Sequence, residues 1–324
     1  MSPRKLKALI TCEVNDGFLH ALEERGIQFE LAGWGQTGIT LTDSEVVAKA
    51  EDCNLLIIEI EGISRDILLR LPKVRFIGVS RGNPVNVDLE YCKEFKIKVV
   101  HTPGRNADSV ADYCVGSMID ISRGLSASRI HLSMEGWMFE EKLPYLEFRG
   151  REIGHQTVGL YGMGNIGKRV AKRLNAGFGT KVIYFDPFVA ADENAKRVES
   201  LDALFTQSDI VSLHAPVVDS TRNTVDRALL SKLGPSGFLI SSARAQIIDE
   251  DDLYLSLVEH EIAGAVLDVY WREPIDQSSR WLQLANVICT PHVAGASLDV
   301  VNNHCSTILK GIDDWLGSPD IEER

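Results

Sequence analysis

The sequence predicts an α/β protein with two doubly wound parallel sheets, each in its own domain. Short apolar runs alternate with amphipathic stretches up to Pro103, and the same alternation restarts at Gln156. Strands that alternate in this way with helices form parallel sheets covered by helices on both faces. The chain has 324 residues, whereas a single hydrophobic core seldom grows beyond about 250–300 residues. We therefore expect two domains.

The segment up to Pro103 has the pattern of one small α/β domain. Its apolar runs are predicted strands, in the order KALIT, FELAGW, NLLIIEIEG, VRFIGVSRG and IKVVHTP. Its amphipathic stretches are predicted helices, in the order FLHALEERG, DSEVVAKAED, RDILLRLP and VDLEYCKEFK. Gly26 ends the first helix, Asp43 or Ser44 is the expected N-cap of the second, and Pro72 ends the third.

The pattern changes at Asn106. The stretch NADSVADYCVGSMIDISRGL predicts a longer helix, because its apolar residues recur at helical spacing. Residues 124–154 are expected to be irregular, and they carry Trp137 and Tyr145 among charged residues. Because a long irregular stretch in a compact protein needs a use, this segment is either a solvated arm or an arm that packs on a second subunit.

The second alternation predicts a larger sheet. Its strands are TVGLYG, KVIYFD, IVSLHA, GFLISSA, GAVLDVY and NVICTP. A parallel sheet of six strands is typical of dinucleotide-binding domains. The last predicted helix, residues 298–317, has no strand after it and could return to the first domain.

Composition argues against several classes of protein. The net charge of −12 disfavours binding to the phosphates of nucleic acids. No apolar run approaches the roughly 20 residues that a membrane span needs, and the N-terminal stretch does not have the pattern of a signal peptide. The six cysteines are far apart, form no CxxC pair and are expected to be reduced and buried. We expect a cytoplasmic protein with no metal site and no nucleic-acid or membrane partner.

The stretch TVGLYGMGNIGKRVAKRL contains glycines at the spacing GxGxxG, between a predicted strand and a predicted helix. This context is what makes the pattern typical of a dinucleotide site. Gly162 allows a tight turn, Gly164 lets a pyrophosphate approach the backbone, and Gly167 lets the helix pack on the strand. The amides of Asn165 and Ile166, at the start of the helix, would face the phosphates.

The second strand of this domain ends at Asp186, which lies 19 residues after Gly167. An acidic residue about 20 residues past the glycines binds the ribose hydroxyls of NAD. The same carboxylate would repel the 2′-phosphate of NADP, and no arginine follows closely. We therefore expect NAD as the cofactor.

Three further strands are followed by polar residues of catalytic type. Arg244 follows GFLISSA, Glu273 follows GAVLDVY, and His292 follows NVICTP. Side chains just past the carboxyl ends of strands point into the ligand crevice of an open α/β sheet. Each residue alone could be an ordinary surface or loop residue. Their occurrence at successive strand ends favours a site beside the nicotinamide.

Taken together, these stretches resemble the D-isomer-specific 2-hydroxyacid dehydrogenases, which include phosphoglycerate dehydrogenase, D-lactate dehydrogenase and glyoxylate reductase. The resemblance covers nearly the whole chain. It rests on YGMGNIG, SARAQIIDE, LDVYWREP, TPHVAGAS, SRGNPVNVD and TPGRNADSVAD. It implies two Rossmann-like domains, with the NAD-binding domain (105–296) inserted into a flavodoxin-like substrate domain (1–104 and 297–324). It also implies a homodimer joined through an arm at about 124–154.

The resemblance also implies the roles of the site residues. His292 is the acid/base that exchanges a proton with the substrate hydroxyl, Glu273 pairs with it and favours the imidazolium, and Arg244 binds the substrate carboxylate and carbonyl oxygen. The expected cofactor-binding residues are Gly162, Gly164, Asn165, Ile166, Asp186, His214, Ala215, Pro216, Thr221, Ala243, Asp268, His292 and Ala294. The expected substrate-binding residues are Arg81, Gly82, Asn83, Asn106 and Arg244.

One residue departs from the family pattern, and two questions stay open. The family usually has glycine directly after the catalytic arginine, whereas this chain has Ala245; if that position needs a positive φ, alanine would strain the loop. The motifs look most like the phosphoglycerate dehydrogenase branch, but they do not identify the 2-hydroxy acid. A non-catalytic NAD sensor, like the corepressors that share the fold, is the alternative function.

Overall fold

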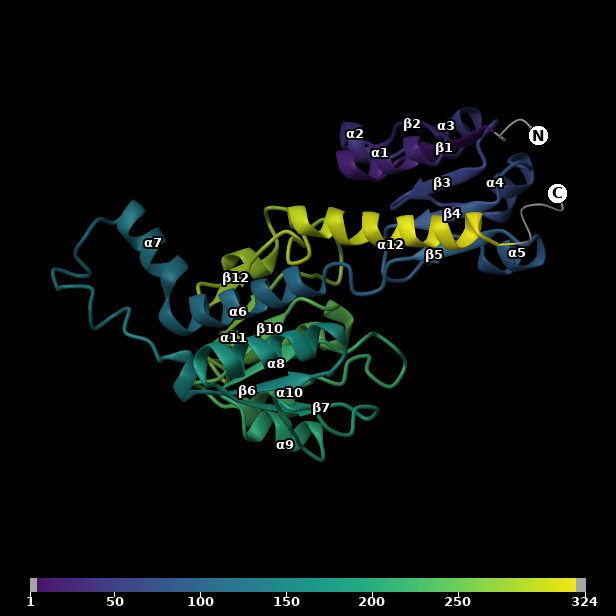
Figure 1. Ribbon diagram of the computed structural model, residues 1–324. Coiled ribbons are helices and arrows are strands. Elements are labelled where there is room, and N and C mark those ends of the chain that lie inside the picture. Colours follow the sequence, from purple (N-terminus) through teal and green to yellow (C-terminus); the bar gives the residue numbers. More distant parts are fainter. Residues whose placement is uncertain (1–4, 319–324) are drawn as a thin grey trace. The chain divides into compact units, whose positions relative to one another are not determined.

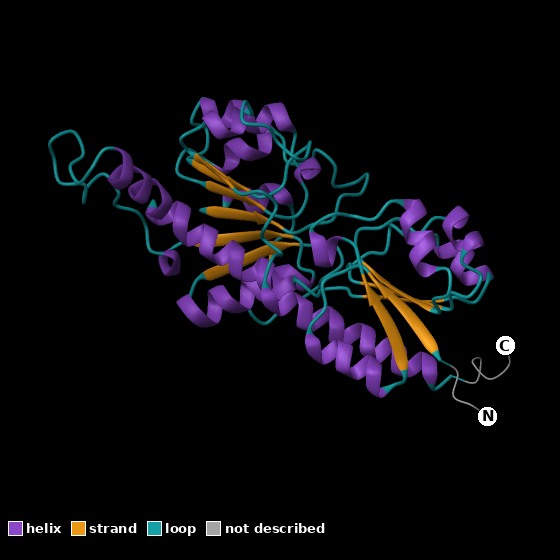
Figure 2. Cartoon of the chain, turned by 90° about the horizontal axis from the view of Figure 1, so that it is seen from above, coloured by secondary structure: helices purple, strands orange, loops and turns teal. Residues whose placement is uncertain are grey.

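The computed structural model describes residues 5–318 and contains two compact units (Figure 1). One unit comprises the chain up to Asn106 together with the segment from Ser297 onward, and the other comprises Ala107–Ala296. The second unit is therefore inserted into the first. Each unit holds one all-parallel sheet with helices on both faces, as Figure 2 shows. The predicted α/β fold class is confirmed.

The sheet of the first unit has the strand order β2-β1-β3-β4-β5. This is the flavodoxin-like order, in which the chain reverses direction across the sheet between β1 and β3. The strands are β1 (Leu6–Ile10), β2 (Ile27–Leu31), β3 (Leu55–Ile58), β4 (Phe76–Val79) and β5 (Lys98–His101). Every residue of β3 and β4 is buried, which explains why these strands are continuously apolar rather than alternating.

Two layers of helices cover this sheet. One face packs against α3 (Asp43–Ala50), α4 (Arg65–Arg70) and α5 (Leu89–Glu94). The other face packs against α1 (Asp16–Glu24) and the C-terminal helix α12 (Leu298–Leu316). Helix α12 lies along β4 and β5 (Figure 1). It approaches closely because Gly78 has no side chain: a Cβ there would lie 2.8 Å from Cγ2 of Ile308.

A partly buried polar network joins the two ends of the inserted segment inside the first unit. Arg105 precedes the insertion, and its Nη1 lies 3.1 Å from Nδ1 of His304 on α12, while its Nη2 pairs with Glu59. The other ring nitrogen, Nε2, lies 2.8 Å from the Glu13 carbonyl oxygen. Burial lowers the pKa of His304 to about 4, so the ring is neutral at physiological pH. It can then accept from Arg105 and donate to Glu13.

The sheet of the second unit has seven parallel strands in the order β12-β11-β10-β9-β6-β7-β8. Counted from β6, this is the doubly wound dinucleotide-binding order with one further strand, and direction reverses between β6 and β9. The strands are β6 (Thr157–Tyr161), β7 (Lys181–Phe185), β8 (Lys196–Arg197), β9 (Ile210–Leu213), β10 (Phe238–Ser241), β11 (Gly264–Leu267) and β12 (Val287–Cys289). The short edge strand β8 was not among the predicted strands.

Helices also cover both faces of the second sheet. Helices α6 (Ala107–Arg123) and α8 (Asn165–Phe178) pack on one face. Helices α9 (Leu201–Thr206), α10 (Arg227–Leu233) and α11 (Glu250–Val258) pack on the other. Short 3₁₀ turns complete the unit: η1 (Ile153–His155), η2 (Ala245–Ile247) and η3 (Arg280–Gln283). Among the described residues, no helix combines the length and apolarity that crossing a membrane would require.

Three local predictions were wrong. The segment expected to be irregular contains helix α7 (Leu125–Met134), which is set off from α6 by Gly124 in the left-handed conformation. The N-cap of α3 is Thr42, which forms a capping box with Glu45; the spacing T-x-x-E was its sequence signal. Directly after β2 the chain forms the short helix α2 (Trp34–Thr37) instead of continuing as a strand.

Candidate active site

The turn between β6 and α8 is shaped by its three glycines. Gly162 has φ +101°, and a Cβ there would lie 2.6 Å from the Ala215 backbone nitrogen. A Cβ at Gly167 would lie 2.4 Å from the Gly162 carbonyl oxygen. Both glycines are therefore required by contacts within the chain. Gly164, in contrast, has no atom within 4 Å of the Cβ position, so space for a ligand remains above the turn.

Helix α8 begins at Asn165, directly after Gly164, and its first turn contains no acidic residue. The free N–H groups at the start of a helix carry partial positive charge and favour phosphate groups. Ile166 is half-buried and Asn165 is exposed. The open side of Gly164 and the uncompensated helix start thus provide an anion site at the carboxyl end of β6.

Asp186 follows β7 and lies next to this turn. One carboxylate oxygen, Oδ2, accepts a hydrogen bond from the Met163 amide at 2.8 Å. The other, Oδ1, accepts from the amides of Phe188 at 2.8 Å and Val189 at 3.1 Å. Asp186 therefore holds the glycine turn against β7, a structural role that its spacing in the sequence did not reveal. Lone pairs remain on both oxygens for ribose hydroxyls.

His214 follows β9 under the glycine turn. Neither ring nitrogen has a hydrogen-bond partner within residues 5–318, although both are buried. Burial lowers the pKa of His214 to about 4, so the ring is neutral. An orphaned buried imidazole is costly unless a ligand supplies a partner. Together with the open Gly164 and Asp186, this unpaired group fits a bound dinucleotide.

The remaining residues predicted to bind the cofactor also follow strand ends of this sheet. Ala215 and Pro216 follow β9, where the hydroxyl of Thr221 donates to the Pro216 carbonyl oxygen at 2.6 Å and closes the loop. Ala243, Asp268 and Ala294 follow β10, β11 and β12. Since carboxyl ends of parallel strands meet at one edge, the second unit gathers all of these residues at the edge that carries the glycine turn.

His292 and Glu273 form a direct pair at this edge. Nδ1 of His292 lies 2.8 Å from Oε2 of Glu273. The other oxygen, Oε1, accepts from the Tyr270 amide at 2.9 Å, which fixes the carboxylate. Burial by itself would raise the pKa of Glu273, but the hydrogen bonds from His292 and Tyr270 and the charges of His292 and Arg244 outweigh it, so the pKa lies below its usual value. Glu273 is thus ionised at neutral pH.

Arg244 is exposed, and its Nη1 donates to the carbonyl oxygen of Ala243 at 2.6 Å. Its charge is felt at Glu273, although the two side chains form no ion pair within 4 Å. Ala245 begins η2 and does not have a positive φ. The strain expected from alanine at this position is therefore absent, because the backbone here does not need the freedom of glycine.

The loop that carries His292 is held by Asp268, which is fully buried. Its Oδ1 accepts from the Thr290 hydroxyl at 2.6 Å and the Val293 amide at 2.8 Å, and its Oδ2 accepts from the Ala294 amide at 2.8 Å. The Tyr113 hydroxyl lies 2.6 Å from the Thr290 hydroxyl. Sequence reasoning missed Thr290 and Tyr113; of the two, only Thr290, the first residue of the TPH motif, had a signal in the sequence.

The residues predicted to bind substrate outside this unit belong to the first unit. Arg81, Gly82 and Asn83 follow β4, where the Arg81 carbonyl oxygen accepts from the Thr102 amide at 2.9 Å. Gly82 and Asn83 are exposed and Arg81 is half-buried. Asn106 is the last residue before the inserted unit and is half-buried. The loop thus lies at the carboxyl edge of the first sheet.

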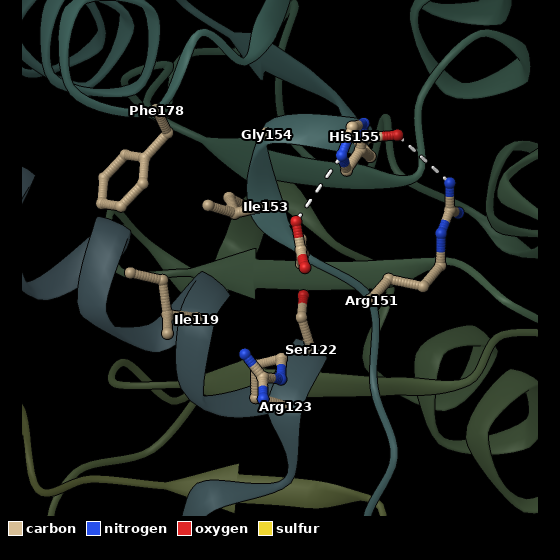
Figure 3. Close-up of a pocket in the computed structure, with 9 residues that line it drawn as sticks. Ile119, Ser122, Arg123, Arg151, Ile153, Gly154, His155 and Phe178 are labelled. Atoms are coloured by element: carbon tan, nitrogen blue, oxygen red, sulfur yellow. Dashed lines mark hydrogen bonds and ion pairs between the residues drawn. The ribbon is translucent and has the colours of Figure 1, made fainter.

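A cavity of about 370 Å³ lies at the other end of the second unit (Figure 3). It is formed by η1, which precedes β6, and by the ends of α6 and α8, so it lies at the amino edge of the sheet and not beside the glycine turn. Figure 3 shows apolar Ile119 and Phe178 on one side and Arg151 and His155 on the other. No cluster of potential metal ligands occurs within the described part of the chain.

The fold and the glycine turn define a dinucleotide-binding protein of the Rossmann class. The sequence profile of the D-isomer specific 2-hydroxyacid dehydrogenase, NAD binding domain, matches residues 115–294. The chain therefore belongs to the D-isomer-specific 2-hydroxyacid dehydrogenase family, and the predicted family resemblance is confirmed.

Individual relatives agree with this assignment. YoaD of Bacillus subtilis, which is named provisionally as a 2-hydroxyacid dehydrogenase, is 34% identical over 319 residues, 98% of this chain and 92% of YoaD. The D-3-phosphoglycerate dehydrogenase of Methanocaldococcus jannaschii is 31% identical over 309 residues, 94% of this chain but 56% of that enzyme. The crystal structure of an NADPH-dependent glyoxylate/hydroxypyruvate reductase from Sinorhizobium meliloti matches with a TM-score of 0.79 and 26% identity, over 97% of this chain and 95% of that one.

Replacing Gly162 by alanine should have a different effect from replacing Gly164 by alanine. Gly162→Ala should lower the free energy of unfolding by about 2–5 kcal/mol, because it adds both a positive-φ strain and a backbone clash. Gly164→Ala should cost less than about 1 kcal/mol, yet weaken NADH binding at least tenfold by filling the open space. Urea unfolding and an NADH fluorescence titration measure the two effects. Equal stability of both variants would contradict this account of the turn.

Proposed function

We propose that this chain interconverts a D-2-hydroxy acid and its 2-keto acid, with His292 as the acid/base and NAD as the cofactor. The observation that carries the proposal is the 2.8 Å contact between Nδ1 of His292 and the ionised Glu273. A carboxylate held in this way stabilises the imidazolium and fixes the ring orientation. Family membership supports the reaction class.

The pair leaves Nε2 of His292 as the nitrogen that can meet a substrate oxygen. In keto-acid reduction Nε2 gives its proton to the carbonyl oxygen, and in hydroxy-acid oxidation it takes the hydroxyl proton back. Bound NADH supplies the hydride that reduces the keto carbon, and bound NAD accepts it in the opposite direction. The guanidinium of Arg244 suits the substrate carboxylate, since its fork of donors matches a planar anion.

The glycine turn and its partners are the proposed cofactor site. Gly164 and the amides at the start of α8 would hold the pyrophosphate, and Asp186 would accept hydrogen bonds from the ribose hydroxyls. The carboxylate of Asp186 also supports a preference for NAD, because a 2′-phosphate beside it would place like charges together. His214 would gain the partner that its buried nitrogens lack.

The substrate is proposed to be a small 2-keto acid of the kind used by the phosphoglycerate dehydrogenase branch. The loop SRGNPVNVD supports this assignment. Its backbone amides, Arg81 and Asn83 are proposed to bind the substrate carboxylate in addition to Arg244. Relatives are named as hydroxypyruvate reductase, D-3-phosphoglycerate dehydrogenase and glyoxylate reductase. A screen of NADH consumption with these proteins' keto acids and with sugar-derived keto acids would identify the substrate.

A homodimer is the proposed assembly, with residues 124–154 as the contact arm. Helix α7 and the segment after it extend away from the sheet of their unit (Figure 1). This arm exposes large apolar side chains: the exposed fraction is 79% for Met134, 69% for Trp137 and 80% for Tyr145. Exposed apolar patches of this kind mark interaction sites. The apolar wall of the cavity at the base of the arm (Figure 3) is one surface on which a second copy could pack.

A cytoplasmic location is proposed from the cysteines. All six are free thiols, and five of them are buried. Thiols that remain reduced are typical of a reducing compartment.

His292→Ala should lower turnover of the active keto acid by about 10²–10⁴, the usual effect of losing a positioned acid/base. NADH binding should change little, because the proposed pyrophosphate and ribose contacts lie elsewhere. Steady-state kinetics and an NADH titration measure both. Unchanged turnover would contradict the role of His292. If the wild type binds NADH but reduces no 2-keto acid in the screen, the non-catalytic sensor is the better description.

Glu273→Gln is the matched test of the pair, since an amide keeps the shape but not the charge. Nδ1 of His292 then loses the carboxylate that faces it at 2.8 Å and balances the charge of the imidazolium. We expect kcat/KM for keto-acid reduction to fall, while NADH binding, measured by titration, changes little. An unchanged kcat/KM would show that Glu273 is not the partner of His292 in the reaction.

Asp186→Ser should relax the cofactor preference, because it removes both the ribose contacts and the repulsion of a 2′-phosphate. We expect kcat/KM for NADH to fall and that for NADPH to rise, so that their ratio drops at least tenfold. Asp186 also anchors the Met163 amide, so thermal unfolding of the variant is measured alongside. Wild-type enzyme that already uses NADPH as well as NADH would refute this reading of Asp186.

The arm prediction is tested by light scattering at micromolar concentration, where the wild type should have the mass of a dimer. Changing Trp137 and Tyr145 together to Asp should shift the mass toward the monomer, because the charges would be buried in the interface. Ile39→Asp is the control: Ile39 is 72% exposed but lies in the first unit. A monomeric wild type would rule out the arm as a dimer contact.

A further inference from the structure

The first unit contains a cavity of about 580 Å³ that belongs to none of the predicted site residues. It lies at the amino edge of the sheet, where Leu6 begins β1, Arg75 precedes β4 and Lys98 begins β5. The loop from Arg81 follows the opposite end of β4. The cavity is therefore separate from the edge of this sheet to which substrate binding is assigned.

Positive charge is concentrated around this cavity. Five lining side chains are cationic and one, Asp314, is anionic. In the whole chain, by contrast, 46 acidic residues outnumber 34 basic ones. The cationic residues are Lys73, Arg75, Lys93, Lys96 and Lys98. A local excess of cations on an acidic protein attracts anions to that place.

The fold does not neutralise three of these cations. A tight turn follows α5, in which the Ile97 amide donates to the Cys92 carbonyl oxygen at 2.7 Å and Lys96 has φ +53°. This turn presents Lys93, Lys96 and Lys98 on the surface, and none of the three has an ion pair with any residue between 5 and 318. Their charges are therefore available to a ligand.

The other two cations, Lys73 and Arg75, already have partners within the chain. Lys73 pairs with Asp52. Arg75 is half-buried, and its Nη1 donates to the carbonyl oxygens of Pro72 at 2.7 Å and Val74 at 2.8 Å. These bonds fix the guanidinium and leave its other N–H donors free. The cavity is thus lined by one guanidinium that the backbone holds in place and by the three exposed lysines at the turn after α5.

The cavity also has an apolar, aromatic wall. Leu6, Pro72, Ile97 and Trp315 contribute to it. Trp315 is half-buried, and its ring centroid lies 5.5 Å from that of Phe76 at an interplanar angle of 46°. This packing holds the indole in place. Aromatic rings fixed next to cations are the groups on which bases stack beside their phosphates.

We propose that this cavity binds a free nucleoside phosphate. The lysine turn and Arg75 would bind the phosphate oxygens through charge-assisted hydrogen bonds, and the wall with Trp315 would receive the base. A volume of about 580 Å³ lies within the range of small-molecule sites. The net charge of −12 disfavours a long nucleic acid, whose further phosphates would meet the acidic remainder of the surface.

The affinity test uses ATP without magnesium, titrated calorimetrically into the full chain. The double variant Lys96→Gln with Lys98→Gln should bind ATP about tenfold more weakly, because two unpaired cations are lost. Lys181→Gln is the control: Lys181 is exposed, at the start of β7 in the second unit, and should stay within about twofold of the wild type. Both lysines of the double variant are exposed, so folding should be unaffected, which thermal unfolding checks.

Chemical mapping locates the site without relying on variants. Pyridoxal 5′-phosphate combines an aromatic ring, a phosphate and an aldehyde that condenses with lysine amines; borohydride then reduces the imine. Peptide mass mapping should find Lys93, Lys96 or Lys98 labelled first, with protection by ATP. Labelling spread evenly over the lysines of the chain would overturn the proposal.

Three other outcomes would overturn it as well. If NADH displaces ATP, and the double lysine variant binds ATP as tightly as the wild type, ATP is bound at the glycine turn. Single-stranded DNA that binds more tightly than ATP would make the cavity part of a nucleic-acid surface. The chain after Ser318 carries Asp320, Glu322 and Glu323, so a chain ending at Ser318 should bind ATP at least as tightly; loss of binding there would place the determinants elsewhere. None of these measurements needs turnover, so they stand apart from the proposed reaction.

Discussion

The geometry of the candidate active site depends on one buried carboxylate, that of Asp268. A carboxylate without solvent is costly unless donors surround it, and here three donors from the loop after β12 do so. These bonds hold the loop in a conformation that places His292 at φ +54°, a region that non-glycine residues seldom adopt. Such strain persists only where the surroundings impose it. Asp268 supplies that constraint, and the imidazole is thereby held 2.8 Å from Glu273.

A second carboxylate, that of Asp186, holds another loop at the same carboxyl edge of the sheet. Asp186 receives three backbone amides and ties the glycine turn to β7, as Asp268 ties the histidine loop to β11. Both carboxylates follow strands: Asp268 accepts its three bonds from the loop after β12, and Asp186 accepts one from the glycine turn after β6 and two from its own loop. Two acidic residues, Asp186 and Asp268, therefore hold the loops at the carboxyl edge of the second sheet through hydrogen bonds.

The first unit places its charges differently. At the carboxyl side of its sheet, the half-buried Arg105 is neutralised by Glu59 and contacts the buried His304, so a satisfied polar network links the chain before the insertion to α12. At the amino side, three lysines around a cavity have no ion pair with any of residues 5–318. Buried cations are paired because desolvation demands it, whereas exposed cations need no partner. The lysines that cluster beside the aromatic wall therefore indicate a ligand more strongly than the paired Arg105 does.

The sequence by itself determined the fold class, the glycine turn, Asp186 as its acidic partner, and the polar residues that follow β10, β11 and β12. These features are local: apolar periodicity, turn residues and motif spacing act over a few residues and can be read in order. It could not show that Asp268 holds the loop of His292, or that Thr290 meets Tyr113, 177 positions away. It also did not reveal α7, the left-handed φ of His292, or the lysine cavity. Each of these depends on strand order and on contacts between distant segments, which only the tertiary structure brings together.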